Sequence, residues 1–318
     1  MPAQSKGSGV RGQRSGVRLF MITTIIILII LLYIYAIPVL ARDIMAHWPE
    51  TLREPGRLPW QALNSTIIYF LSAFGISDFA ICTALYHKTG WAGPRKLPGT
   101  LNTQCAMPVL IYGISYLTGV EVDLITLLPC MAALTLGAYL SPRLAVRLPV
   151  RRIRQILVAG LLFAGSFILA GKLQLLPLSG GETGLSGIKL FIAPVCFFAI
   201  GALKAMGIGS YPLTMSVAFF LGLHPLVSYP IMMGGGALAA PVMMLRFVRM
   251  DAYMRRLTLL ASTFGLAGAA VAVFVVKSLD ISLLQWLVVA VVYYASADML
   301  LQLRREARAE RQAAEKSE

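Results

Sequence analysis

Two apolar segments of this chain are interrupted by similar residues, and these interruptions hold the side chains best suited to chemistry. One reads Phe74-Gly-Ile-Ser-Asp-Phe79 and the other Met206-Gly-Ile-Gly-Ser-Tyr-Pro212. In lipid, unwound backbone survives only where it is buried in protein or lines a wet cavity, because its N–H and C=O groups need partners. Breaks that recur in both halves of a duplicated membrane protein mark a substrate site. The pairing therefore predicts a transporter.

The second interruption follows a lysine inside an apolar run. Lys204 lies 14 residues after Leu190, where the run begins. At about 1.5 Å per residue this is about 21 Å into a hydrocarbon core roughly 30 Å thick. An ammonium group there costs about 2.5–3.5 kcal/mol, so it normally faces a cavity or a counter-ion. One interpretation is an anion contact assisted by backbone N–H groups near Gly207 and Gly209, and the equally weighted alternative is snorkelling or structural pairing.

The first interruption contains the only acidic residue of its segment, Asp78. This carboxylate could take up a proton and couple transport to the proton gradient, or it could pair with Lys204 across the repeat interface. The favoured interpretation is a helix N-cap, because Ser77 and Asp78 after Gly75 suit the restart of a broken helix. One carboxylate could serve both purposes.

Neutral donors complete the candidate site. With the positive ends of half-helices they could hold an oxyanion, although each one taken alone is more commonly an interhelical hydrogen-bonding group. The predicted substrate-binding residues are Lys204, Gly207, Gly209, Ser210, Tyr211, Gly75, Ser77, Asn102, Thr103, Gln104 and Ser228, with Asp78 as the coupling residue.

Composition places these residues in a polytopic, all-α membrane protein. The 318 residues are 58% apolar and 13% charged, with a mean hydropathy of +0.75. The net charge of +14 comes from basic residues between apolar runs, which membrane topology explains, so no nucleic-acid partner is expected. The three histidines and four cysteines show no metal-ligand spacing, and neither a P-loop nor a catalytic arrangement is present. We expect no cofactor, no metal and no enzymatic activity.

Runs without Lys or Arg predict eight or nine membrane segments, some of them irregular. The run Leu19–Ala41 is longer than a signal-peptide core, which favours a retained first helix over a signal cleaved after Ala41. The run Ala205–Leu245 holds too many Gly and Pro residues for one straight helix. The other runs are Gln61–Tyr86, Gly99–Val120, Leu124–Pro142, Gln155–Gly171, Leu190–Leu203, Leu257–Val276 and Ile281–Ala297.

The positive-inside rule predicts that all basic clusters, and with them both termini, lie in the cytoplasm of a bacterial inner-membrane protein. The connections Arg42–Trp60, Glu121–Asp123 and Lys172–Lys189 then face outward. The clusters are the N-terminal tail, 87–96, 143–154, 246–256 and the C-terminal tail, and the 143–154 arginines most simply fix orientation, with anionic lipid as a minor addition.

A weak internal repeat relates the two halves. Val122-Asp123 aligns with Met250-Asp251, and Gly137 with Gly265, both at an offset of 128. Equivalent points on opposite faces indicate inverted repeats. Both Gly-Ile segments nevertheless run inward under this assignment, so either one of them is a re-entrant hairpin or one loop has been placed on the wrong side. The predicted units are a basic tail (1–18), a leading helix (19–41), repeats at 61–178 and 187–303, and a C-terminal tail (304–318).

The order and spacing of these motifs resemble the TauE/SafE family of sulfite and organosulfonate exporters. The first copy reads Phe74-Gly-Ile-Ser-Asp-Phe, Gly99-Thr-Leu-Asn-Thr, Val122-Asp123 and Leu140-Ser-Pro-Arg-Leu-Ala-Val-Arg-Leu-Pro149, and the second Ala205-Met-Gly-Ile-Gly-Ser-Tyr-Pro and Leu223-His-Pro-Leu-Val-Ser. Ser77-Asp78 replaces the consecutive glycines common in that family, and the leading helix is additional. The resemblance covers roughly Gln61–Ser296 and implies a sulfur-containing substrate.

Together these observations predict a secondary permease or exporter that moves a small anion by alternating access. Sulfite, an organosulfonate or a carboxylate is the expected substrate, membrane lipid is the expected surroundings, and a homo-oligomer is compatible with the sequence. The alternatives are an intramembrane enzyme, which would need converging catalytic side chains, and a membrane scaffold, which would have little reason to keep paired breaks and a mid-membrane lysine.

Overall fold

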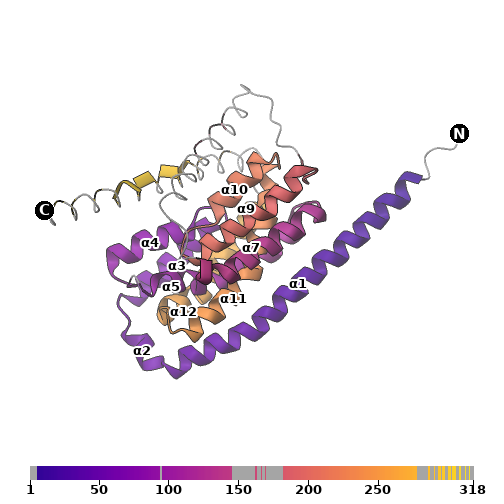
Figure 1. The fold of residues 1–318 in the computed structure, drawn as a ribbon. Helices are drawn as coiled ribbons and strands as arrows, with labels where there is room; N and C mark the ends of the chain where they lie inside the picture. The colour runs from indigo at the N-terminus through magenta and orange to yellow at the C-terminus, as the bar shows by residue number, and fades with distance from the viewer. Residues whose placement is uncertain are drawn as a thin grey trace.

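The computed structural model describes residues 6–93, 95–144 and 182–277, with scattered single positions at 162, 166 and 169 and between 286 and 315. Within these ranges the chain forms helices and no named strand (Figure 1). Five of the helical stretches described are long and apolar enough to cross a membrane: Gly16–Ala46, Leu124–Ser141, Ile188–Ala205, Pro230–Arg249 and Arg255–Val275. The expected all-α membrane class is therefore confirmed at this level.

The leading helix α1 (Lys6–Ala46) is longer than the predicted 19–41 segment. Its apolar side chains recur all round, which is typical of a helix with lipid on one side and protein on the other. In Figure 1 it runs along one flank of the bundle and extends beyond it at the N-terminus. One stripe is buried and the opposite face is exposed; the stripe consists of Ile22, Ile25, Ile29, Tyr33, Ala36, Leu40 and Ile44.

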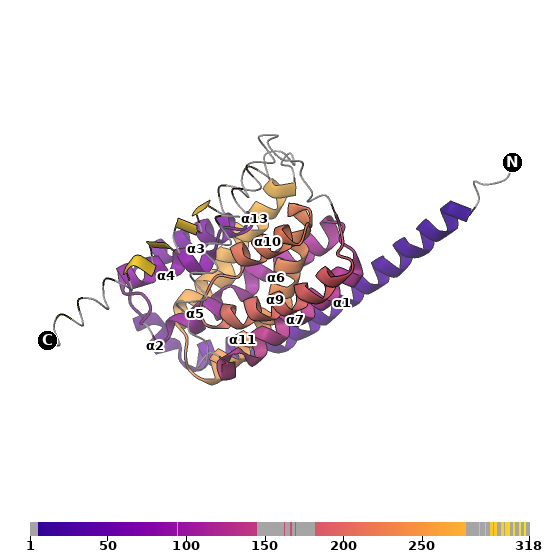
Figure 2. The same ribbon diagram turned by 45° about the horizontal axis from the view of Figure 1, so that its top comes forward.

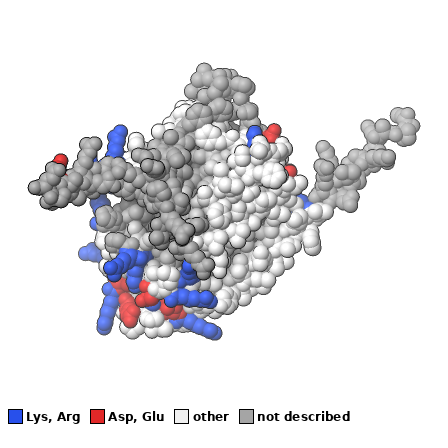
Figure 3. Space-filling model, in the orientation of Figure 1, with Lys and Arg blue, Asp and Glu red and all other residues white. Residues whose placement is uncertain are grey.

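The two ends of α1 identify the two ends of the bundle. We call one the α2 end, because α2 (Trp48–Arg53) lies there; its contacts include Arg255 Nε to Asp43 Oδ2 at 2.8 Å and Lys96 Nζ to Asp251 Oδ1 at 3.9 Å. The opposite end is marked by Arg18, whose Nη1 lies 2.9 Å from Glu121 Oε1. Figure 3 shows charged side chains gathered around the α2 end, beside an uncharged flank.

This arrangement corrects the predicted sidedness. The connection Arg42–Trp60 was expected opposite the 246–256 cluster, yet Asp43 and Glu54 bind Arg255 and Arg256 directly. Arg18, expected on the same side as that cluster, lies at the other end of α1, about 37 Å away at 1.5 Å per residue. The error arose because a count of basic residues cannot show that Asp43 and Glu54 contact Arg255 and Arg256, which lie about 200 residues later in the sequence. The basic clusters therefore do not all share one side; the arginines at 147–154 lie outside the described residues.

The first interrupted run, predicted as Gln61–Tyr86, forms a hairpin that starts and finishes at the α2 end. Helix α3 (Leu58–Ser72) enters the bundle, the chain breaks at 73–77, and α4 (Asp78–Thr89) returns. A contact between the two ends of this segment shows the return. The indole nitrogen of Trp91, just after α4, lies 2.8 Å from the position that a Cβ on Gly56, just before α3, would occupy. The segment is therefore a hairpin rather than one continuous helix.

The chain then crosses to the opposite end and comes back. Helices α5 (Leu97–Gln104) and α6 (Ala106–Gly119) make one bent passage, which places Glu121 next to Arg18. Helix α7 (Leu124–Leu144) returns to the α2 end, where the Tyr139 carbonyl accepts a hydrogen bond from Arg246. The α7 span agrees closely with the predicted Leu124–Pro142.

The second interrupted run is also a hairpin, but its base is at the opposite end. Helix α9 (Ile188–Ala205) begins beside the start of α7, where Leu185 N donates to Thr126 Oγ1 at 2.7 Å. After the break at 206–210, α10 (Tyr211–Phe220) returns until His224 N donates to the Glu182 carbonyl at 2.9 Å. Figures 1 and 2 show α7 and α9 side by side.

The rest of the described chain makes two further passages. A 3-10 turn η2 (Pro225–Val227) and a π-helical turn η3 (Pro230–Gly234) lead into α11 (Gly235–Arg249), which ends at the α2 end. Helix α12 (Arg255–Leu260), the π-helical turn η4 (Ala261–Gly265) and α13 (Leu266–Lys277) then run back. The prediction that Ala205–Leu245 is not one straight helix is confirmed.

Candidate functional site

The two breaks meet inside the bundle. A Cβ placed on Gly209 would stand 1.9 Å from Ser77 Oγ, so any larger residue there would force the serine side chain to move. Gly75, at φ +83°, faces Met215 of α10, and the Phe74 carbonyl accepts a hydrogen bond from Tyr229 Oη at 3.3 Å. Gly207, at φ +87°, faces Leu101 of α5. Two segments 132 residues apart in sequence thus form one unwound region, as their pairing predicts.

Lys204 lies in the last turn of α9, where only 2% of the residue is exposed. Its Nζ has no hydrogen-bond partner among the described residues. The nitrogen lies 3.4 Å from the position that a Cβ on Gly236 of α11 would occupy, and Val109 Cγ1 of α6 lies 3.1 Å from that position. The ammonium group therefore points between α11 and α6. A buried ammonium without a hydrogen bond is costly unless a counter-charge faces it.

The candidate counter-charge is Asp78, the first residue of α4, which is 3% exposed and lies within electrostatic range of Lys204. No ion pair shorter than 4.0 Å joins the two residues in the described structure. Asp78 occupies the first position of α4, one residue after the N-cap position, where a negative charge interacts favourably with the helix N-terminus. Its Oδ2 has no hydrogen-bond partner within the described chain. The helix thus begins at Asp78 rather than being capped by it, and the role of Asp78 as a coupling residue stays a prediction.

Asn102 adds a third polar atom from α5. Its Nδ2 donates to the Pro98 carbonyl at 2.9 Å and to the Lys204 carbonyl at 3.4 Å, which holds α5 against the end of α9. Its Oδ1 is buried and accepts no hydrogen bond from the described residues. A buried amide oxygen normally has a donor, so this atom is available to a ligand that carries one.

Two of the predicted substrate-binding residues form hydrogen bonds within the protein instead. Thr103 Oγ1 lies 2.8 Å from Thr258 Oγ1 and also donates to backbone carbonyls of its own helix. Gln104 accepts from Tyr86 Oη at 2.8 Å and donates to Cys82 Sγ at 3.2 Å. These side chains fix α5 to α12 and α4 rather than presenting free polar atoms.

The remaining predicted residues line the second break or its surroundings. Ser210 precedes α10, and its carbonyl accepts from Thr214 N at 2.9 Å. Tyr211 is buried and lies within electrostatic range of the Asp78 carboxylate. Ser228 is buried one residue before Tyr229, whose ring stacks on that of Tyr116 at 4.9 Å.

The structure adds polar groups that the sequence analysis did not select. Tyr69 Oη, Ser72 Oγ and Thr214 Oγ1 are buried without a hydrogen-bond partner in the described part of the chain. Tyr69 and Tyr112 also lie within electrostatic range of Asp78, and Tyr112 Oη donates to the Tyr69 carbonyl. All of these residues except Tyr112 lie within about two helical turns of a break, a criterion that could have found them. A π-helical turn, a feature frequent at functional sites, sits beside the cluster at η3.

The described residues hold no group of three or more His, Cys, Asp or Glu side chains placed to bind a metal ion. Comparison of the chain with protein families, with curated proteins and with solved structures finds no match.

Proposed function

We propose that this protein is a secondary transporter of a small anion, with its site where the two breaks meet. The observation that carries the proposal is the burial of Lys204 Nζ, Asp78 Oδ2 and Asn102 Oδ1 beside two unwound segments, each without a hydrogen-bond partner in the described chain. Intramembrane ionisable groups that face one another across broken helices are typical of substrate and coupling-ion sites. A scaffold would gain nothing from this costly arrangement.

The proposal includes an inverted repeat. The hairpin α3–α4 has its base at the α2 end and α9–α10 at the opposite end, while Asp251 and its counterpart Asp123 lie at those same two ends. The packing also repeats, since Gly268 touches the Thr66 carbonyl of α3 and Gly137 touches the Phe198 carbonyl of α9. Such a pair of units supports alternating access, in which one rocks against the other around a fixed site. We propose eight or nine membrane segments in total and a place in the bacterial inner membrane.

The chemistry of the site suggests how binding could be coupled. Lys204 attracts the anion, and backbone N–H groups freed at the 206–210 break can donate to its oxygens. While Asp78 is ionised it competes with the substrate for the lysine; a proton on Asp78 removes that competition and lets the anion take its place. Anion and proton would then move together. Sulfite, an organosulfonate or a small carboxylate fits this requirement, and the TauE/SafE resemblance favours the sulfur compounds.

Flux in proteoliposomes tests the proposal. Purified protein should accumulate radiolabelled sulfite, taurine-like sulfonates or acetate-sized carboxylates faster than empty liposomes, and unlabelled substrate should compete. Equal flux in protein-containing and empty liposomes for every anion, with no binding by calorimetry, would exclude an anion transporter.

Lys204→Met tests the site itself. Loss of one charge-assisted contact of about 1.5–3 kcal/mol should weaken anion affinity by roughly 10- to 150-fold. The matched control is Lys189→Met, which removes the same charge from the exposed start of the same helix. Wild-type affinity in a well-folded Lys204→Met protein would assign Lys204 to structure alone.

A further inference from the structure

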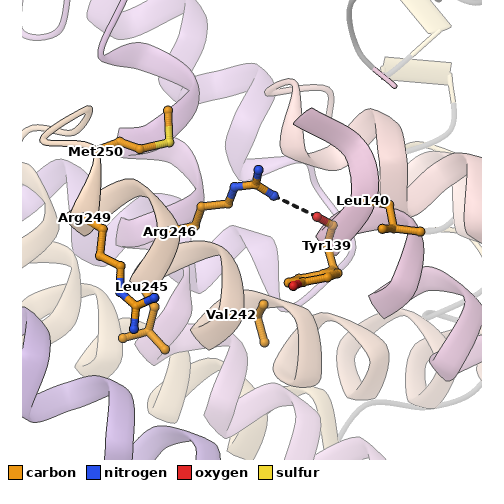
Figure 4. Close-up of a pocket in the computed structure, with 7 residues that line it drawn as sticks. All are labelled: Tyr139, Leu140, Val242, Leu245, Arg246, Arg249 and Met250. Carbon is orange, nitrogen blue, oxygen red and sulfur yellow. Dashed lines mark hydrogen bonds between the residues drawn. The ribbon is translucent and has the colours of Figure 1, made fainter. Parts of the chain in front are cut away.

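A pocket of about 370 Å³ opens between the C-terminal halves of α7 and α11, away from the buried cluster (Figure 4). Its walls come from two α7 residues and from one face of α11. The lining residues are Tyr139, Leu140, Val242, Leu245, Arg246, Arg249 and Met250. Volumes from about 300 Å³ upward are typical of sites for small molecules.

Two arginines give this pocket a positive charge that the described protein does not neutralise. Arg246 Nη1 donates to the Tyr139 carbonyl at 2.9 Å, and Arg249 Nη2 makes one long contact of 3.5 Å to Tyr35 Oη. Neither guanidinium pairs with a carboxylate among the described residues. A guanidinium has five N–H donors, so each has several left for a ligand.

The neighbouring arginines of the same end show that this lack of partners is specific to the pocket. Arg255 contacts Asp43 and Asp251 at 2.8 Å each, and Glu50 at 3.9 Å. Arg256 donates to the carbonyls of Leu52 and Gly56. Acidic side chains are thus available at the α2 end, but they gather around Arg255 and leave Arg246 and Arg249 to an external anion.

The pocket changes character along α11. Val242 lies one helical turn, about 6 Å, before Arg246, and Leu245 comes directly before Arg246 in sequence. Leu140 of α7, which is 36% exposed, also lines the pocket. An apolar stretch of α11 therefore leads to a pair of arginines at the end of this helix. This polarity matches a lipid whose acyl chain lies along the helix and whose phosphate lies at its end.

We infer that this pocket binds an anionic phospholipid, with the headgroup phosphate between Arg246 and Arg249 and an acyl chain along Val242 and Leu245. Paired guanidinium groups bind phosphate oxygens through parallel charge-assisted hydrogen bonds. The lipid would join α7 to α11 at the α2 end. This inference does not depend on the transported substrate.

Native mass spectrometry of the full chain in neutral detergent tests the proposed lipid binding. The protein is titrated with phosphatidylglycerol and, separately, with phosphatidylcholine that carries the same acyl chains, and the two affinities are compared. We expect phosphatidylglycerol to bind at least tenfold more tightly. Arg246→Gln with Arg249→Gln should reduce its affinity to the phosphatidylcholine level. The control, Arg53→Gln with Arg57→Gln, removes the same charge from the same end outside the pocket and should leave the preference intact.

Arg249→Gln alone guards against a folding artefact, because Arg249 is exposed and makes one long contact. It should weaken phosphatidylglycerol binding about fivefold at unchanged thermal stability. Equal affinity for the two lipids, or equal weakening in the control variant, would overturn the inference. So would displacement of the lipid by millimolar inorganic phosphate, since that would make the pocket a site for free anions.

Discussion

The hairpins α3–α4 and α9–α10 have the same backbone design but are anchored by different chemistry. Each breaks at a glycine with positive φ, Gly75 or Gly207. At the base of the first, Glu54, in the segment that leads into α3, accepts hydrogen bonds from the backbone N–H groups of Arg255 and Arg256 at 2.8 and 2.9 Å, and Arg255 in turn forms ion pairs with Asp43 and Asp251. The base of the second is held by Thr126 and by backbone hydrogen bonds between Asp123 and Thr183 and between His224 and Glu182. Two similar hairpins can therefore differ in what is needed to release them.

The largest difference should appear on removal of the ionic anchor. The Arg255 side chain is 4% exposed, so Arg255→Met leaves Asp43 without its main partner. Breaking a buried ion pair in this way costs about 3–5 kcal/mol of unfolding free energy. Thermal unfolding in detergent measures it, with Arg53→Met as the exposed control, for which a change within about 0.5 kcal/mol is expected. Equal stability of the two variants would show that the ion pairs do not anchor the first hairpin.

The contact between the two breaks should give the next largest effect. Gly209→Ala places a methyl group on Ser77 Oγ and should destabilise the protein by about 1–3 kcal/mol. Ser77→Gly removes the obstacle, so the double variant should recover most of that loss. Purely additive effects in this double-mutant cycle would mean that the breaks do not touch.

The two charged residues of the breaks should be functionally separable. If Asp78 carries the coupling proton, a pH gradient of one unit supplies about 1.4 kcal/mol, or tenfold accumulation of the anion. Asp78→Asn should abolish this accumulation but still exchange labelled for unlabelled substrate. Accumulation that follows the pH gradient in both proteins would remove proton coupling from the mechanism.

The smallest effect is expected at the other hairpin base. Thr126→Val keeps the shape of the side chain but removes the acceptor of the Leu185 N–H, at a cost of about 1 kcal/mol. Raising the ionic strength should weaken the exposed contacts at the α2 end, such as Lys96 with Asp251, and leave the Thr126 bond unchanged. A loss in Thr126→Val as large as that in Arg255→Met would remove the contrast between the two bases.

The base of the first hairpin also holds a titrating group. Burial raises the pKa of the Glu54 carboxyl, although the N–H groups of Arg256 and Arg255 act in the opposite direction. A carboxyl with a raised pKa in the folded state binds protons more readily than in the unfolded chain. Its ionisation therefore lowers stability as the pH rises through that pKa. The hydrogen bonds to the start of α12 therefore offset only part of the free-energy cost of burying the ionised Glu54 carboxylate.

Sequence predicted the interrupted elements better than their positions relative to the membrane. Gly75 and Gly207 could be recognised because few other residues tolerate positive φ, and Lys204 because an ammonium inside an apolar run is costly. The sidedness of Arg42–Trp60 could not be predicted by counting basic residues, because it depends on which distant acids neutralise them. Likewise, Thr103 and Gln104 look like ligands in sequence, and only their partners Thr258 and Cys82 show otherwise.

The close approach of α7 and α9 has a mechanical consequence. Cβ atoms on Gly137 and Gly201 would stand 2.0 Å from carbonyl oxygens of the facing helix, so the two backbones touch over this stretch. Gly268 makes a similar approach from α13 to α3. Helices whose backbones are in contact cannot easily slide past each other. We therefore expect α7 with α9, and α13 with α3, to move as two rigid bodies. We expect the pivot between the two pairs to lie at the contact of Ser77 with Gly209, where neither segment is regular helix.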